Sequence, residues 1–121
     1  MEFQALTPNL IVSDINRSTA FYSDVLGFQQ IATVPEQAPF VFVWLKHGAV
    51  DVFLNRPQDT PPAAGTNSMY IKLRGIDELA ANIERAGVKV VIPMHTEFYG
   101  MKEFAVHDPD GYLVIFAEAV K

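Results

Sequence analysis

SDINRSTAFYSDVLGF, residues 13–28, is the stretch of sequence that decides the fold. Asp14 is a favourable helix N-cap, and the apolar residues that follow it form one broad stripe at helical spacing. We expect a helix from Ile15 to about Leu26. Gly27 is expected to end it, because glycine readily adopts the left-handed conformation that closes a helix.

The residues on either side of this helix predict a half-unit with the order β-α-β-β-β. Short segments rich in aromatic and β-branched side chains flank the helix and are separated by turn-forming residues. Lys46-His47-Gly48 is expected to turn a hairpin. The predicted strands are residues 6–12, 28–34, 40–45 and 50–54.

The second half of the chain repeats this order. Asp77 is expected to cap a second helix with apolar residues at helical spacing, and Gly87 is expected to close it. Pro93 is expected to stop the following strand, which leaves residues 94–100 as a loop. Asp-Pro-Asp-Gly at 108–111 fits a type I turn. The predicted strands are residues 69–73, 88–92, 101–106 and 112–117.

The internal repeat determines the predicted fold class. Neither half buries enough apolar surface alone, so the two sheets must share a core or curl into an incomplete barrel. We expect an α+β fold in which two βαβββ modules form a cupped, partly open mixed sheet with the helices outside. Module one spans residues 5–55 and module two residues 68–119. A proline-rich linker, residues 56–67, joins them in a single domain, residues 1–121.

Composition excludes several classes of function. The chain has 121 residues, no cysteine and a net charge of −5. It therefore has no disulfide framework and no thiolate metal site, and its charge argues against binding nucleic acid. The negative charge serves solubility or favours a cationic small molecule. We see no signal peptide and no apolar run long enough to cross a membrane, so we expect a soluble, cytoplasmic protein.

Three stretches of the chain resemble the vicinal oxygen chelate superfamily, which includes glyoxalases, bleomycin-resistance proteins and extradiol dioxygenases. They are residues 12–22 with Phe-Tyr, residues 24–28 with Leu-Gly-Phe, and residues 104–112 with the Asp-Pro-Asp-Gly turn. The resemblance implies paired modules, a sheet cupped around a cavity and a homodimer. It also commonly implies a divalent ion that four protein side chains hold and that chelates the substrate.

The four positions that would hold this ion are Thr7, Val52, Tyr70 and Ile115. None is a normal ligand of a divalent ion, because such ions bind carboxylate, carbonyl or imidazole groups. Neighbouring carboxylates at 51 and 118 are expected to face away, since side chains alternate along a strand. We therefore expect no metal and no cofactor, as in the bleomycin-resistance-like members that bind without chelation.

Aromatic side chains indicate a different kind of pocket. Phe42 and Trp44 alternate on one strand and share a face, while Tyr99 and Phe104 lie in or after the long loop of module two. An aromatic pocket binds flat or cationic ligands, although each side chain could instead belong to the core or a dimer interface. The candidate ligand-binding residues are Thr7, Phe42, Trp44, Val52, Tyr70, Tyr99, Phe104 and Ile115.

Two further residues, His95 and Glu97, are spaced as metal ligands on a strand would be. Because they are expected in a loop, we interpret them as solvated or as hydrogen-bonding groups at the rim of the pocket. His107 is expected to bond locally in its turn, and His47 to lie in the hairpin turn. No residue is assigned a catalytic role.

These observations favour a binding protein of the bleomycin-resistance type, which sequesters an aromatic or cationic small molecule. The alternative is a metal-dependent glyoxalase, lyase or dioxygenase-like enzyme with a non-standard metal site. A third hypothesis is an enzyme that works without metal and uses Tyr70, His95 or Glu97 as an acid or base. We expect a homodimer with neither nucleic-acid nor membrane partners.

Overall fold

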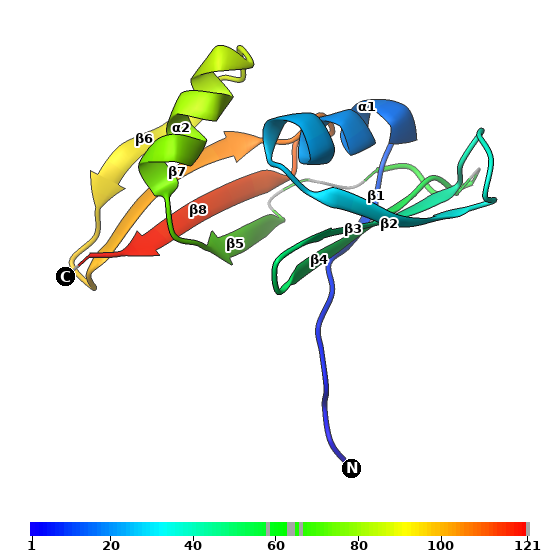
Figure 1. Ribbon diagram of the computed structural model, residues 1–121, viewed down its shortest axis with the longest axis horizontal. Helices are drawn as coiled ribbons and strands as arrows, with labels where there is room; N and C mark the ends of the chain where they lie inside the picture. The colour runs from blue at the N-terminus through cyan, green and yellow to red at the C-terminus, as the bar shows by residue number, and fades with distance from the viewer. Residues whose placement is uncertain (58, 63–64, 66, 121) are drawn as a thin grey trace. The chain divides into compact units, whose positions relative to one another are not determined.

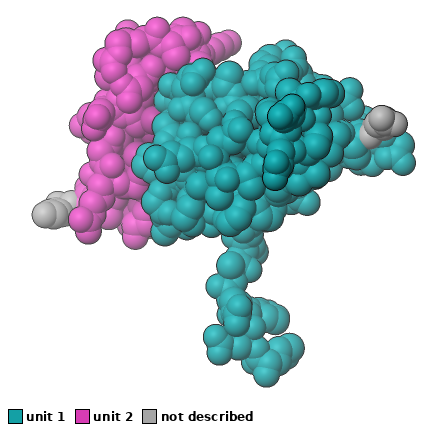
Figure 2. Space-filling view, turned by 45° about the vertical axis from the view of Figure 1, so that its right-hand side comes forward, with its two compact units in different colours: residues 1–63 teal, residues 64–121 magenta. Residues whose placement is uncertain are grey.

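The computed structural model describes residues 1–57, 59–62, 65 and 67–120. The chain forms two compact units, residues 1–63 and residues 64–121 (Figure 2). Each unit has one mixed four-stranded sheet and one helical segment that packs on one face of that sheet (Figure 1). The predicted α+β class and the repeated β-α-β-β-β order are confirmed.

Unit 1 has its strands in the order β1-β4-β3-β2, with β1 parallel to β4 and the other pairs antiparallel. The strand predicted at residues 6–12 is shorter than expected. Only three residues pair with β4, and Leu6 is 92% exposed. The elements are β1 (Asn9–Ile11), α1 (Ile15–Ala20), η1 (Phe21–Val25), β2 (Gln29–Val34), β3 (Phe42–His47) and β4 (Val50–Asn55).

The helical segment of unit 1 confirms the opening prediction. The Asp14 carboxylate accepts a hydrogen bond from the Arg17 backbone N–H at 3.0 Å. The α-helix widens into the π-helical turn η1 after Ala20. Gly27 follows with a φ of 81°, which is the left-handed conformation expected at the end of a helix.

Asp14→Ala is expected to lower the free energy of unfolding by about 1 kcal/mol, because the Arg17 backbone N–H in the first turn loses its side-chain acceptor. Urea denaturation measures this loss. Asp24→Ala is the matched control, since Asp24 is exposed within the same helical segment. Equal losses for the two variants would show that Asp14 does not act as a cap.

Unit 2 has its strands in the order β5-β8-β7-β6, with β5 parallel to β8 and the other pairs antiparallel. Its elements are β5 (Ser68–Lys72), α2 (Ile76–Arg85), β6 (Val90–Thr96), β7 (Met101–His107) and β8 (Leu113–Ala119). The Asp-Pro-Asp-Gly turn is present, with the Gly111 N–H donating to the Asp108 carbonyl at 3.0 Å. The predicted linker includes residues 58, 63, 64 and 66, which lie outside the described residues.

Two sequence predictions for unit 2 are wrong. Asp77 lies inside the first turn of α2, and Gly75 occupies the N-cap position with a φ of 94°. The Glu118 carboxylate, from β8, caps the helix by accepting from the backbone N–H groups of Gly75 and Ile76. Pro93 does not end β6, which runs on to Thr96. An edge strand tolerates proline because one side of its backbone needs no partner.

Each sheet has a helix face, which packs against the helix, and a far face on its other side. In unit 1 four helix-face side chains, two from β3 and two from β4, are completely buried. In unit 2, Lys102 pairs with Asp77 of α2 at 2.8 Å, which fixes the helix face of β7. The core side chains that define the helix faces are Val43, Leu45, Val52 and Leu54 in unit 1, and Phe104, Val106, Val114 and Phe116 in unit 2.

Candidate functional site

A polar cluster on the far face of unit 2 surrounds the carboxylate of Glu103. Glu103 lies in the middle of the largely apolar strand β7 and is only 6% exposed, which is unusual for a carboxylate. One carboxylate oxygen, Oε2, accepts hydrogen bonds from the hydroxyls of Tyr70 at 2.5 Å and Tyr99 at 2.8 Å. These two donors offset part of the cost of burying a charge. We call Tyr70, His95, Glu97, Tyr99 and Glu103 the Glu103 cluster.

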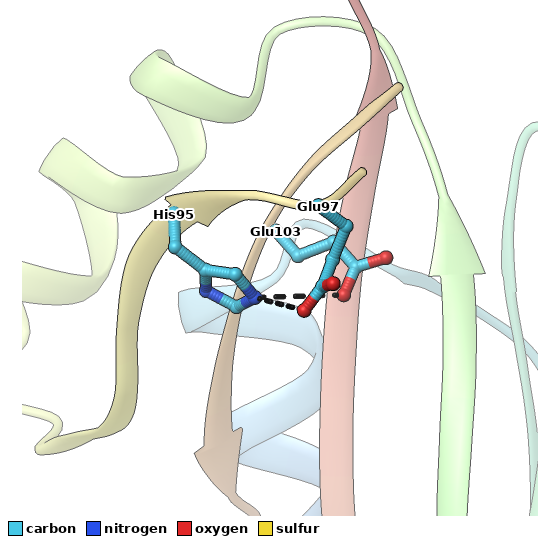
Figure 3. Close-up of side chains that lie close together, drawn as sticks. All are labelled: His95, Glu97 and Glu103. Carbon is cyan, nitrogen blue, oxygen red and sulfur yellow. Dashed lines mark hydrogen bonds and ion pairs between the residues drawn. The ribbon is translucent and has the colours of Figure 1, made fainter. Parts of the chain in front are cut away.

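The second carboxylate oxygen of Glu103 faces the imidazole of His95. His95 lies on β6 directly opposite Glu103 in the sheet register, so both side chains are on the far face. Glu97 follows directly after the end of β6, and its carboxylate contacts the His95 imidazole. His95 Nε2 is 3.0 Å from Glu97 Oε1 and 3.9 Å from Glu103 Oε1 (Figure 3).

The irregular backbone around Pro93 sets the orientation of the imidazole. The register between β6 and β7 shifts between Ile92 and His95, which indicates a β-bulge. The Pro93 carbonyl lies 2.8 Å from His95 Nδ1. Since a carbonyl can only accept, Nδ1 carries a hydrogen and donates it. The ring is therefore held with Nε2 directed at the two glutamates.

The charges of the cluster shift the pKa values of its members. Hydrogen bonding to the Glu103 carboxylate, aided by burial, raises the pKa of Tyr70 and that of Tyr99 to about 12. Both phenols are therefore neutral donors at physiological pH. The hydrogen bond to the Pro93 carbonyl and the neighbouring Glu97 carboxylate raise the pKa of His95, and burial opposes this rise.

The far face of unit 1 carries aromatic side chains around one carboxylate. The indole N–H of Trp44 donates to Asp51 Oδ1 at 2.8 Å, and Lys46 pairs with the same carboxylate at 3.2 Å. Phe53 contacts the rings of Phe42 and Trp44 edge to face. The hydrogen bond from Trp44, and then Lys46, lower the pKa of Asp51 against an opposing effect of burial.

Six of the eight predicted ligand-binding residues are at least partly exposed. Tyr70 and Ile115 are register partners on the far face of unit 2, and Tyr99 is 53% exposed. The six are Thr7, Phe42, Trp44, Tyr70, Tyr99 and Ile115.

Val52 and Phe104 need a correction, because their side chains lie in the cores of their units. They are 0% and 1% exposed and lie on the helix faces. The register of β4 was therefore assigned one residue out of phase. Asp51, which was expected to point away, shares the far face with Trp44. The expectation that Glu118 faces away is confirmed by its bonds to α2.

The side chains at the four positions suggested by the resemblance do not fit a divalent ion. Ile115 has no donor atom, and on β4 the carboxylate that lies on the far face, Asp51, is already bonded to Trp44 and Lys46. The Tyr70 hydroxyl already donates to Glu103, and its raised pKa disfavours the phenolate that a metal would need. We therefore derive no chemistry from a metal at these positions.

Sequence reasoning missed Glu103, which is the centre of the cluster. The available signal was a single carboxylate inside the apolar strand segment MKEFAVH, residues 101–107. A carboxylate buried among apolar residues must have donors nearby, which marks it for attention. The prediction of a loop at residues 94–100 also hid the neighbour of Glu103 on β6, because it removed His95 from a defined strand face.

Comparison with known proteins identifies the family. Residues 4–116 match the model of the Glyoxalase/Bleomycin resistance protein/Dioxygenase superfamily. The chain belongs to this superfamily. Bleomycin resistance proteins of Geobacillus stearothermophilus and Staphylococcus aureus are 31% identical to it over 126 residues, which cover 94% of this chain and 96% of the relative.

Several solved structures have a fold similar to that of this chain. TioX from Micromonospora sp. ML1 has a TM-score of 0.83 at 21% identity, covering 98% of this chain and 100% of its own. TnmS3, an antibiotic binding protein from Streptomyces sp. CB03234, has a TM-score of 0.80 at 20% identity, with 98% of both chains covered. These likenesses establish the fold that this superfamily member shares with them.

Within the described residues, no helix has the length and apolar character needed to cross a bilayer.

Proposed function

We propose that this superfamily member is a small-molecule binding protein of the bleomycin-resistance type. It sequesters an apolar or aromatic ligand, including ligands that carry positive charge. The observation that carries the proposal is the pairing of aromatic rings with carboxylates on both far faces. Trp44 lies beside Asp51 in unit 1, and Tyr70 and Tyr99 lie beside Glu103 in unit 2.

The chemistry of these groups suits a flat cationic ligand. Half-exposed aromatic rings offer stacking and cation–π contacts, which are worth about 0.5–2 kcal/mol each. Nearby carboxylates attract a positive group without requiring a bond to be made or broken. The curated relatives at 31% identity are bleomycin resistance proteins, which supports the same type of ligand. We also propose a cytoplasmic homodimer, as the family resemblance and the lack of cysteine suggest.

Thermal unfolding with metal-free bleomycin tests this function. At a hundredfold excess over Kd, a ligand that binds only the folded protein adds about 2.7 kcal/mol and raises Tm by about 10 °C. The emission of Trp44 should change along the same titration, since it is the single tryptophan of the chain. A Tm unaffected by bleomycin and by flat aromatic cations would contradict the proposal.

Variants identify the groups that hold the ligand. Trp44→Leu in unit 1 and Tyr99→Leu in unit 2 each remove a ring that can stack on a ligand at the far face of its own unit. Loss of the ring at the face that binds the ligand is expected to weaken binding about tenfold or more. Phe98→Leu is the control, since Phe98 is 97% exposed beside Tyr99 and is not part of the cluster. Equal affinity in all three variants would place the ligand elsewhere.

Size-exclusion chromatography with light scattering tests the proposed homodimer, because it separates dimer from monomer.

A further inference from the structure

The atoms around His95 Nε2 are placed as the ligands of a bound cation would be. Nδ1 must donate to the Pro93 carbonyl, so a neutral imidazole has no hydrogen on Nε2. Yet Nε2 points at Glu97 Oε1 from 3.0 Å, and both atoms are then acceptors. Glu103 Oε1 is a third electron-rich atom, 3.9 Å from the same nitrogen. One imidazole nitrogen and two carboxylate oxygens thus lie close together.

The spacing of these three atoms fits the ligand set of a metal ion. Zn²⁺ binds nitrogen and carboxylate oxygen at about 2.0–2.1 Å with tetrahedral geometry, which separates neighbouring ligand atoms by about 3.3 Å. The two distances from Nε2, 3.0 and 3.9 Å, lie on either side of this value. A proton on Nε2 satisfies only Glu97, because 3.9 Å is too long for a hydrogen bond to Glu103.

We propose that His95 Nε2, Glu97 Oε1 and Glu103 Oε1 bind one zinc-type divalent ion in unit 2. One ligand atom from each of these three residues lies within 4.8 Å of the other two (Figure 3). The site is distinct from the four positions that the superfamily resemblance suggested. His95 and Glu97 are about one third exposed, so an ion can enter from solvent.

Neighbouring residues already hold the ligands as a metal site requires. A histidine that binds a metal usually donates its other ring N–H to a carbonyl or carboxylate, as His95 does to Pro93. A ligating carboxylate is usually hydrogen-bonded through its other oxygen, as Glu103 is by Tyr70 and Tyr99. Both features arise from groups that are not themselves ligands, so they support the site independently of the ligand spacing.

The donor set indicates the class of ion. One imidazole and two carboxylates suit Zn²⁺ and its first-row neighbours, whereas Mg²⁺ and Ca²⁺ prefer oxygen alone. Two carboxylates balance the two charges of the ion, and the neutral imidazole adds none. Three protein ligands leave one tetrahedral position for water or for an oxygen of a bound molecule.

Calorimetric titration of the EDTA-treated, dialysed protein with ZnCl₂ tests the proposal. Wild type is expected to bind one Zn²⁺ per chain. His95→Asn and Glu97→Gln are each expected to weaken binding by about a hundredfold or more, because each removes a ligand. Tyr99→Phe is expected to weaken it by about 10- to 100-fold, because Glu103 loses a group that orients it.

Two control variants distinguish this site from non-specific zinc binding at the protein surface. His107→Asn removes another histidine of unit 2, and Glu84→Gln removes an exposed carboxylate of α2. The zinc affinity of both variants is expected to stay within about twofold of wild type, because neither change removes a ligand or a group that orients one. Circular dichroism in EDTA checks that every variant is folded. Zinc affinity that is unchanged in His95→Asn and Glu97→Gln, or that is lost in His107→Asn, would overturn the proposal.

The inference does not rest on the proposed function. Zinc binding is read from calorimetry of the protein alone, whereas ligand binding is read from thermal shift with metal-free bleomycin. A protein that binds bleomycin but not zinc refutes only the ion site. One that binds zinc at His95 but no aromatic ligand refutes only the sequestering role.

Discussion

Phe104→Ala is expected to lower the free energy of unfolding by about 3–5 kcal/mol. The side chain is 1% exposed on the helix face of β7, and its ring lies 5.2 Å from that of Phe116. Truncation removes a large apolar side chain from the tightly packed core. It leaves a cavity that the surrounding side chains can fill only in part. Such a loss is a large part of the total free energy of unfolding, which is about 5–15 kcal/mol for a typical domain.

Urea denaturation followed by circular dichroism measures this loss, with Phe98→Ala as the matched control. Phe98 is 97% exposed, so the same truncation there is expected to cost less than about 0.5 kcal/mol. The pair also tests the correction made to the predicted site. If Phe104→Ala left stability unchanged and weakened only ligand binding, Phe104 would be a pocket residue after all.

Val52→Glu is expected to destabilise the protein by at least about 3 kcal/mol, because it places an unpaired carboxyl among side chains with no exposure. Burial raises the pKa of the introduced carboxyl in the folded state. The unfolded chain loses its proton near pH 4.3, while the folded chain keeps it. Stability therefore falls as pH rises above that value, so the variant is less stable at pH 7 than at pH 4.

The register of β4 is what this substitution tests. If Val52 occupied the far face, as the family resemblance suggested, a glutamate there would be solvated and could ligate a metal. Asp51→Val is the matched change at the neighbouring position, where the side chain is partly exposed and contacts Trp44 and Lys46. It is expected to cost far less stability than Val52→Glu. The reverse order of the two losses would restore the original register.

Local sequence signals were sufficient wherever one residue controls a local backbone conformation. Asp14 capped its helix and Gly27 ended it, because each acts on neighbours within a few residues. The same reasoning failed at Asp77. The cap of α2 is a carboxylate on β8, 42 residues further along the chain. A helix end can be satisfied by any donor or acceptor that the fold brings near, and spacing in the sequence does not reveal this.

Strand faces were predicted with mixed success, since alternation tells which side chains share a face but not which face is covered. Phe42 and Trp44 lie together, as expected, with Val43 and Leu45 on the opposite side. In β4, however, both registers offered a credible pattern. Only the packing of α1 on the sheet decided that Val52 is core and Asp51 is not.

The candidate site shows the same division. By itself, the sequence determined the family and the two βαβββ modules, because these depend on residue types and short motifs. The tertiary structure alone decided that His95, Glu97 and Glu103 converge. That convergence depends on a strand that continues through Pro93 and on the pairing of β6 with β7, which are long-range hydrogen bonds that no local pattern specifies.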